Sequence, residues 1–185
     1  MRLRMAFYGA FCVSAAMLAS AGAQTVTPGE EGELAKFLAP EPGRHICYAR
    51  VYSLEHLKKH PRQQVTEVGF RLAYYRHEPD DFFPKGQRNY YFAMLAKQRG
   101  SDRTLTAMGE CSPDGDRISC GVECDGGGVT VSRRPSDRIL ISLDRIRMSA
   151  GCDEEDAVDV EGGADDREFL LSRVEDAACP AYEDW

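Results

Sequence analysis

Two histidines four residues apart are the side chains of this chain that most resemble a reaction centre. His56 and His60 flank Leu57-Lys58-Lys59, and on a helix their imidazoles would share one face, as two zinc ligands do. The two lysines would place positive charge beside such a cation, and no glutamate follows His56 as a metalloprotease helix requires. Because the segment offers no third ligand and no base, we expect an exposed polar turn that holds neither a metal nor another cofactor.

Signatures of other enzymes are missing from the sequence. There is no G-x-S-x-G nucleophile elbow and no H-E-x-x-H helix, and the acidic clusters at 114–116 and 159–162 lack the spacing of an EF-hand calcium loop. The formal net charge is -7, which disfavours a nucleic acid as partner, because phosphate binding draws on clustered Lys and Arg. We therefore do not expect an enzyme, and a hydrolase without a recognisable motif ranks third among the functions below.

The segment 1–23 has the organisation of a secretory signal peptide. Arg2 and Arg4 precede an apolar run at 5–18, and Ala21-Gly22-Ala23 supplies the small residues of a cleavage site. Cleavage after Ala23 predicts a periplasmic or secreted protein. The apolar run is too short to span a membrane comfortably and no similar run follows it, so we expect no membrane span after cleavage.

An even set of cysteines remains once Cys12 leaves with the leader, which in an oxidising compartment predicts disulfides. Cys120 and Cys124 would lie about 13 Å apart on one strand face at 3.3 Å per residue, too far to bridge each other. In a meander, Cys111 shares a face with Cys120 on the neighbouring strand, Cys124 meets the returning chain, and closure joins the first and last strands. The expected pairs are Cys111–Cys120, Cys124–Cys152 and Cys47–Cys179.

Period-two hydrophobicity dominates the chain from Ile46 onward. Val68, Phe70 and Leu72 alternate with charged or small residues, which is the pattern of a half-buried strand. The run 88–99 is also rich in helix formers, so its pattern fits both a strand and a helix. We expect about eight strands, near 45–52, 65–75, 89–97, 103–111, 117–125, 128–133, 138–148 and 168–175.

Residue pairs that contain glycine predict the turns between these strands. The Asp-Gly pair at 114–115 fits a two-residue turn that would set Cys111 opposite Ile118. The Gly-Gly pair at 126–127 fits a second such turn. The apolar phase of the strand at 138–148 shifts part-way along, as a β-bulge at residues 144 and 145 would cause.

A lead-in at 24–44 precedes a β domain at 45–185 whose C-terminal segment is acidic. Prolines stop a short helix within 30–38 at both ends, and Ser53 can cap a helical turn over 54–60. We predict a mainly β, single-domain, disulfide-stabilised antiparallel meander or closed β-barrel. In outline it resembles calycin-like barrels, a likeness of architecture that transfers no function.

Six aromatic residues gather in one strand–loop–strand unit. They lie before, within and after a loop at 78–84 that is rich in proline and acidic residues. If Phe82 and Phe83 are exposed there, they form an apolar patch beside tyrosines, the composition of a partner or ligand contact. If they fold back, they plug the core instead. The candidate contact residues are Tyr74, Tyr75, Phe82, Phe83, Tyr90 and Tyr91.

Two functions fit these features. The first is an exported, non-enzymatic binding protein of the cell envelope, an inhibitor or an accessory subunit whose partner is an unknown envelope protein. Periplasmic inhibitors of lysozymes and proteases are often small disulfide-bonded barrels, which is an analogy of class only. The second is a carrier that binds a small apolar ligand in the barrel mouth, lined by the aromatic residues. A filled interior favours the first function, and an open apolar cavity favours the second.

Overall fold

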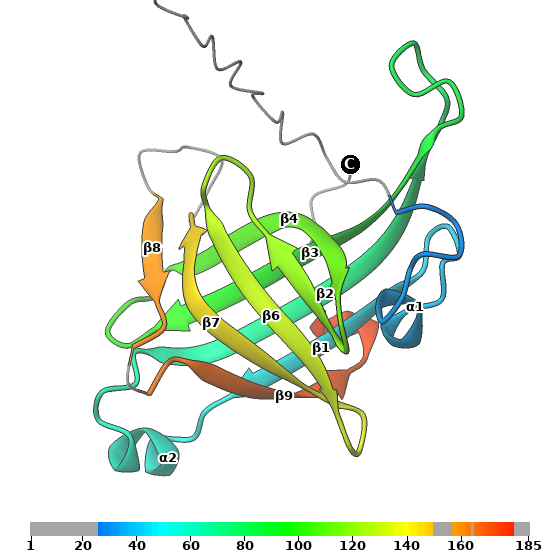
Figure 1. Cartoon of the computed structure of the whole chain (residues 1–185). Helices are drawn as coiled ribbons and strands as arrows, with labels where there is room; N and C mark the ends of the chain where they lie inside the picture. Colours follow the sequence, from blue (N-terminus) through cyan, green and yellow to red (C-terminus); the bar gives the residue numbers. More distant parts are fainter. Residues whose placement is uncertain (1–25, 150–156, 164, 180–185) are drawn as a thin grey trace, which may run out of the picture.

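The chain folds into a closed barrel of antiparallel β-strands (Figure 1), as the sequence predicted. The computed structural model describes residues 26–149, 157–163 and 165–179, so the expected leader lies outside the described residues. The strands are β1 (His45–Val51), β2 (Val65–His77), β3 (Gln87–Gln98), β4 (Thr104–Asp114), β5 (Arg117–Gly121), β6 (Gly127–Arg134), β7 (Arg138–Met148), β8 (Val158–Glu161) and β9 (Glu168–Val174).

Eight of these strands form the ring. β1 to β7 follow one another around it in chain order, and β9 closes it by pairing with both β7 and β1. The segment 89–97, left open above, belongs to strand β3. β8, which we did not predict, continues the edge of β7 beyond the point where β9 ends, since β9 pairs with residues 138–142 and β8 with residues 145–148.

The two predicted helical segments are present, although the first is shorter than expected. Helix α1 (Leu34–Phe37) lies within the lead-in, and helix α2 (Leu54–Lys59) follows β1. The Ser53 hydroxyl caps α2 by accepting a hydrogen bond from the His56 N–H at 3.2 Å. A 3-10 turn, η2 (Asp176–Ala178), follows β9. In the described ranges, no helix is long and apolar enough to cross a membrane.

Large side chains fill the interior of the barrel. Alternate residues of the strands are buried and join one hydrophobic core, which also takes in Leu34, Phe37 and Leu38 from the lead-in at one end. The rings of Phe70 and Phe92 stack inside it with centroids 6.1 Å apart. An eight-stranded barrel is just wide enough for such filling. The largest fully buried side chains are Tyr90, Phe70, Phe92, Phe169, Leu34, Leu72, Met94, Ile118, Ile139, Ile141, Leu143 and Ile146.

The predicted β-bulge in β7 is confirmed. Gly128 of β6 pairs with Arg145, whereas its neighbour Val129 pairs with Leu143. Asp144 is therefore the extra residue on β7, and it lets the buried positions on either side of it face the core.

The β4–β5 turn lies one residue later than predicted. Asp114 pairs with Arg117, so the two central residues of the turn are Gly115 and Asp116, and Gly115 carries the positive φ of 61°. Cys111 consequently lies opposite Cys120, and not opposite Ile118.

The β5–β6 turn is longer than predicted. β5 ends at Gly121, and residues 122–126 form the turn, closed by a bond from the Val122 N–H to the Gly127 carbonyl. Cys124 and Asp125 adopt positive φ there. The expected extension of this strand to residue 125 is therefore wrong, and Cys124 lies on an exposed turn.

Two of the three predicted disulfides are confirmed. Cys111–Cys120 joins β4 to β5 inside the core, and Cys47–Cys179 ties the segment after β9 to β1. Cys124 forms no disulfide with the described cysteines, and its predicted partner Cys152 lies outside the described residues.

Candidate functional site

The β2–β3 hairpin extends beyond the wall of the barrel. β1 pairs with β2 no further than Ala73, and β4 pairs with β3 only from Tyr90 onward. Past these points, β2 and β3 continue to pair with each other out to His77 and Gln87. Residues 74–89 thus form a projecting two-stranded arm, which rises at the upper right of Figure 1.

The tip of the arm is apolar and open to solvent. Phe82 is 89% exposed and Phe83 is 42% exposed, so the alternative in which both rings plug the core is wrong. The Asp80 Oδ1 accepts hydrogen bonds from the backbone N–H groups of Phe82 at 2.8 Å and Phe83 at 2.6 Å. This Asx-type turn holds the two rings on a hydrogen-bonded loop away from the core.

Gly86 closes the loop where it rejoins β3. Its φ of +73° is one that residues with a side chain rarely adopt, and a Cβ there would lie 2.5 Å from the His77 carbonyl oxygen. Its N–H donates to the Phe83 carbonyl at 2.8 Å. Only glycine satisfies both demands, so the path of the tip is fixed at this residue.

The four tyrosines of the candidate set divide between the two faces of the β2–β3 hairpin, at the base of the arm. Tyr74 and Tyr90 are buried on the inner face, with their rings edge to face at 5.2 Å. The Tyr90 hydroxyl donates to the Leu38 carbonyl at 3.1 Å. Burial raises the pKa of Tyr90 well above its usual range, and the charge of Glu31 adds to this. These two tyrosines anchor the arm in the core.

The other two tyrosines lie on the outer face, where a histidine that we did not single out joins them. The His77 ring nitrogen Nε2 lies 2.6 Å from the Tyr91 hydroxyl, and the ring of Tyr75 packs edge to face on His77 at 4.6 Å. Tyr91 is nearly covered, whereas Tyr75 is 39% exposed. The alternation of β2 places His77 beside Tyr75, which is the signal that could have found it.

The charge around the tip is mainly negative. Glu78, Asp80 and Asp81 are all exposed, and Lys85 is the one basic residue of the loop. Within the described part of the chain, none of these three carboxylates lies within ion-pair distance of a basic group. The tip therefore combines exposed aromatic area with unneutralised negative charge.

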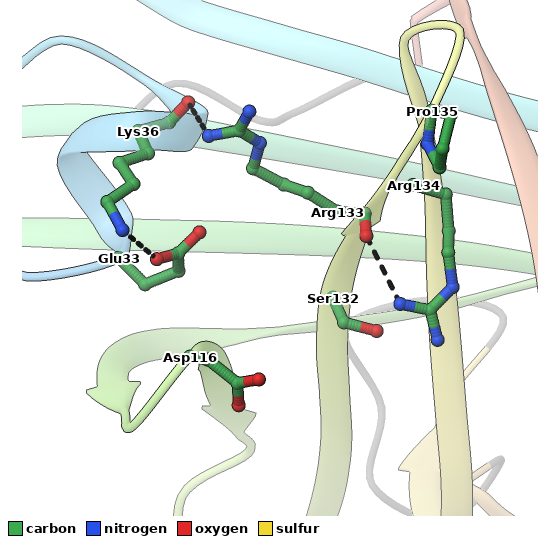
Figure 2. Close-up of a pocket in the computed structure, with 7 residues that line it drawn as sticks. All are labelled: Glu33, Lys36, Asp116, Ser132, Arg133, Arg134 and Pro135. Atoms are coloured by element: carbon green, nitrogen blue, oxygen red, sulfur yellow. Dashed lines mark hydrogen bonds and ion pairs between the residues drawn. The ribbon is translucent and has the colours of Figure 1, made fainter.

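A second feature is a polar depression of about 440 Å³ between α1 and the β6–β7 hairpin (Figure 2). The Arg133 guanidinium donates to the Lys36 carbonyl at 3.4 Å, and the Lys36 ammonium lies 2.7 Å from Glu33. Ser132 supplies a hydroxyl to its lining, and none of the seven lining residues is a histidine or a cysteine. Its walls are too polar for a small apolar ligand. The lining residues are Glu33, Lys36, Asp116, Ser132, Arg133, Arg134 and Pro135.

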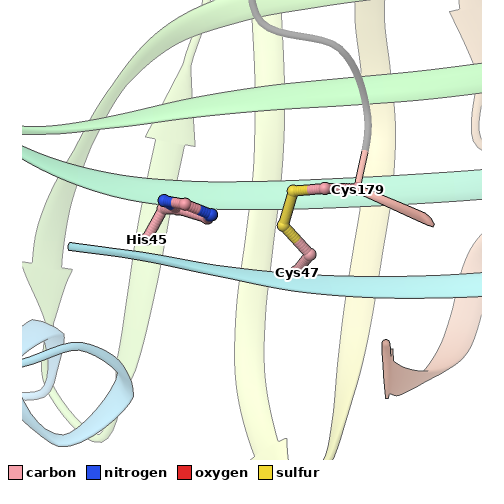
Figure 3. Close-up of side chains that lie close together, drawn as sticks. All are labelled: His45, Cys47 and Cys179. Atoms are coloured by element: carbon pink, nitrogen blue, oxygen red, sulfur yellow. A yellow bond between two sulfur atoms is a disulfide. The ribbon is translucent and has the colours of Figure 1, made fainter. Parts of the chain in front are cut away.

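His56 and His60 share one face of the α2 turn, as their spacing predicted. Their rings stack with centroids 4.2 Å apart, and the His56 Nε2 lies 3.0 Å from the Gln63 Oε1. Among the described residues, they are not part of a group of three metal-ligating side chains. The group that does come together consists of His45, Cys47 and Cys179 (Figure 3).

Comparisons of the chain with protein-family models, curated proteins and solved structures find no match. The fold alone transfers no function. The arm, the depression and the His45 group are therefore the features from which a function has to be argued.

Proposed function

We propose that this protein is an exported, non-enzymatic binding protein of the cell envelope that contacts a partner protein through the tip of its arm. It would act as an inhibitor or an accessory subunit. The observation that carries the proposal is the 89% exposure of Phe82 at the end of a projecting hairpin. An exposed aromatic side chain on a preformed loop is the usual form of an interface anchor, because little conformational entropy is lost when it docks.

The chemistry of the tip restricts the partner. Two adjacent phenylalanines need an apolar recess, and Glu78, Asp80 and Asp81 favour a basic rim around it. A narrow projecting hairpin reaches into a concave site better than onto a flat surface. The partner we propose is accordingly an envelope protein with a cleft that is apolar at its centre and basic at its edge.

The filled interior weighs against the alternative of an apolar-ligand carrier. A carrier needs an open apolar volume of at least about 300 Å³, whereas the barrel centre holds Phe70, Phe92 and Phe169 in full burial. An enzyme finds little support in the depression, since the Arg133 and Arg134 guanidinium groups donate to backbone carbonyls and the Glu33 carboxylate is paired with the Lys36 ammonium.

The test is capture of a partner from an envelope extract of the source organism by the immobilised protein. Three forms are compared: wild type, the tip variant Phe82→Ala/Phe83→Ala, and the control variant Val51→Ala/Leu54→Ala. Val51 and Leu54 are 69% and 78% exposed, so the control removes exposed apolar side chains that lie outside the arm. Captured proteins are identified by mass spectrometry, and their affinity is then measured with purified components.

We expect wild type and control to capture the same protein and the tip variant to lose at least about 30-fold in affinity, since truncating an interface anchor costs about 2 kcal/mol or more. A partner that binds wild type and the tip variant equally would refute the assignment of the tip. Equal losses in the tip and control variants would refute it as well, because they would indicate non-specific apolar adhesion.

A further inference from the structure

His45 and Cys47 share the outer face of β1. Their neighbours Ile46 and Tyr48 point inward and belong to the hydrophobic core, so the two-residue period of a strand places positions 45 and 47 together on the outside. This side-by-side arrangement of an imidazole and a thiol on one strand is fixed by the same alternation that builds the barrel.

Cys179 reaches this pair from the other end of the described chain. β9 runs beside β1, pairing Val174 with Cys47, and the η2 turn then folds back over β1. The donor atoms of His45, Cys47 and Cys179 all lie within 4.8 Å of one another. Figure 3 shows the imidazole beside the disulfide. Asp176 adds a fourth group, since its Oδ1 lies 3.2 Å from the His45 Nε2.

We propose that the Cys47–Cys179 disulfide is the oxidised form of a zinc site. When the disulfide is reduced, the two thiolates and the His45 imidazole bind one Zn²⁺, and Asp176 orients the imidazole. Sulfur and nitrogen donors are the ligands that Zn²⁺ prefers, with bonds of about 2.3 Å to sulfur and about 2.0 Å to nitrogen. Tetrahedral donors at these bond lengths lie roughly 3.5 Å apart, so after reduction the two sulfurs have to separate from bonding distance to that spacing, while His45 is already nearby.

The carboxylate of Asp176, 3.2 Å from the imidazole, strengthens the case for a metal. Zinc-bound histidines commonly pair their second ring nitrogen with a carboxylate, which fixes the ring and makes it a better ligand. Asp176 is in the position to do this for His45. The group His56–His60 has an amide at the corresponding place, from Gln63, and lacks sulfur donors.

Conversion of the Cys47–Cys179 disulfide into the zinc site needs a thiol reductant. A reductant thiolate attacks a sulfur of the disulfide, and a second reductant thiol completes the exchange, so that two thiols become one disulfide and Cys47 and Cys179 each gain a proton. Binding of Zn²⁺ then displaces those two protons, because only thiolates ligate the metal. Exchange with a disulfide oxidant reverses both steps: the oxidant is reduced to two thiols, the Cys47–Cys179 bond reforms and the ion is released.

Accessibility separates this disulfide from the other one. Cys47 is only 1% exposed, but its partner Cys179 is half-buried and lies outside the barrel wall, whereas Cys111 and Cys120 are both buried in the core, at 3% and 1% exposed. Since exchange requires that a thiolate reach one sulfur, a mild reductant should open Cys47–Cys179 first. The barrel core keeps its own cross-link during this step.

The experiment titrates cobalt(II), a spectroscopic substitute for zinc, into the full chain carrying Cys12→Ser, Cys124→Ser and Cys152→Ser. A mild dithiol reductant is applied and removed without air, and alkylation with mass spectrometry identifies the reduced cysteines. We expect Cys47 and Cys179 to be labelled first, and one cobalt ion per chain to bind with a thiolate-to-metal charge-transfer band. Zinc should displace the cobalt, and the oxidised protein should show no such band.

Two histidine variants and a circular dichroism spectrum make the test decisive. His45→Ala should weaken cobalt binding at least about 10-fold, while the control His60→Ala leaves it unchanged. Equal binding by the two variants would overturn the proposal, as would a reduced protein without the charge-transfer band. A reduced protein that loses the spectrum of the barrel before it binds metal would overturn it too, because the site depends on the folded β1 and η2.

Discussion

A buried carboxylate that the sequence did not single out should be worth more to stability than any surface ion pair. Asp166 is 4% exposed, and its two oxygens accept hydrogen bonds from the backbone N–H groups of Gln64 at 2.6 Å and Val65 at 3.1 Å. These bonds tie the segment before β9 to the start of β2. A hydrogen bond to a charged group contributes about 1.5–3 kcal/mol. Asp166→Ala removes both bonds and takes the partner from the buried Val65 N–H, so it should cost about 3 kcal/mol.

The neighbouring Asp165 supplies a matched control. Its carboxylate, which is 17% exposed, lies 3.7 Å from the exposed Arg62 guanidinium, and at this long distance the pair should contribute no more than about 1 kcal/mol. Both variants remove one negative charge from adjacent positions, so their difference isolates the two backbone bonds. Urea unfolding followed by circular dichroism gives the free energy of unfolding, and the melting temperature of Asp166→Ala should fall by roughly 6–12 °C. Equal losses in the two variants would refute the reasoning.

Two further predictions concern the aromatic residues. The tip variant Phe82→Ala/Phe83→Ala should change the free energy of unfolding by less than about 0.5 kcal/mol per site. Phe92→Ala should instead lower it by about 3–5 kcal/mol, because it leaves a cavity in the core. A large drop in the melting temperature of the tip variant would contradict the exposure of its two rings. Burial raises the pKa of Tyr90 in the fold, so its contribution to stability should be complete below pH about 10 and should be lost as the pH rises from there toward the raised pKa. Urea midpoints between pH 9 and 11 should therefore fall less steeply in Tyr90→Phe than in wild type, and parallel slopes would argue against it.

The barrel could be predicted from the sequence because its strands carry dense period-two patterns. Val68, Phe70 and Leu72 are all fully buried, as their spacing required. The same pattern could not fix the hairpin registers. Moving one strand by two residues keeps every side chain on its own face, so Cys111 opposite Ile118 and Cys111 opposite Cys120 satisfy the hydrophobic pattern equally well.

The candidate site was predictable in composition but not in placement. Whether Phe82 and Phe83 point into the core or into solvent depends on how far β2 and β3 continue past their outer neighbours, and this is a property of strand lengths elsewhere in the sheet. The clustering of His45 with Cys179 depends on barrel closure, which brings together residues from opposite ends of the chain. A single sequence records directly neither how far β2 and β3 extend past their neighbours nor which residues from opposite ends of the chain come together.

A barrel whose centre is filled must place any function on its periphery. The eight strands leave two departures from a plain closed wall: the arm, where β2 and β3 outrun β1 and β4, and the seam, where β1 and β9 meet over only three residue pairs. The first carries exposed aromatic area that the core does not need. The second carries an imidazole and a carboxylate beside a disulfide, groups that closing a barrel does not require. The partner contact and the metal site that we propose lie at these two departures, and each can be tested without disturbing the other because they share no residue.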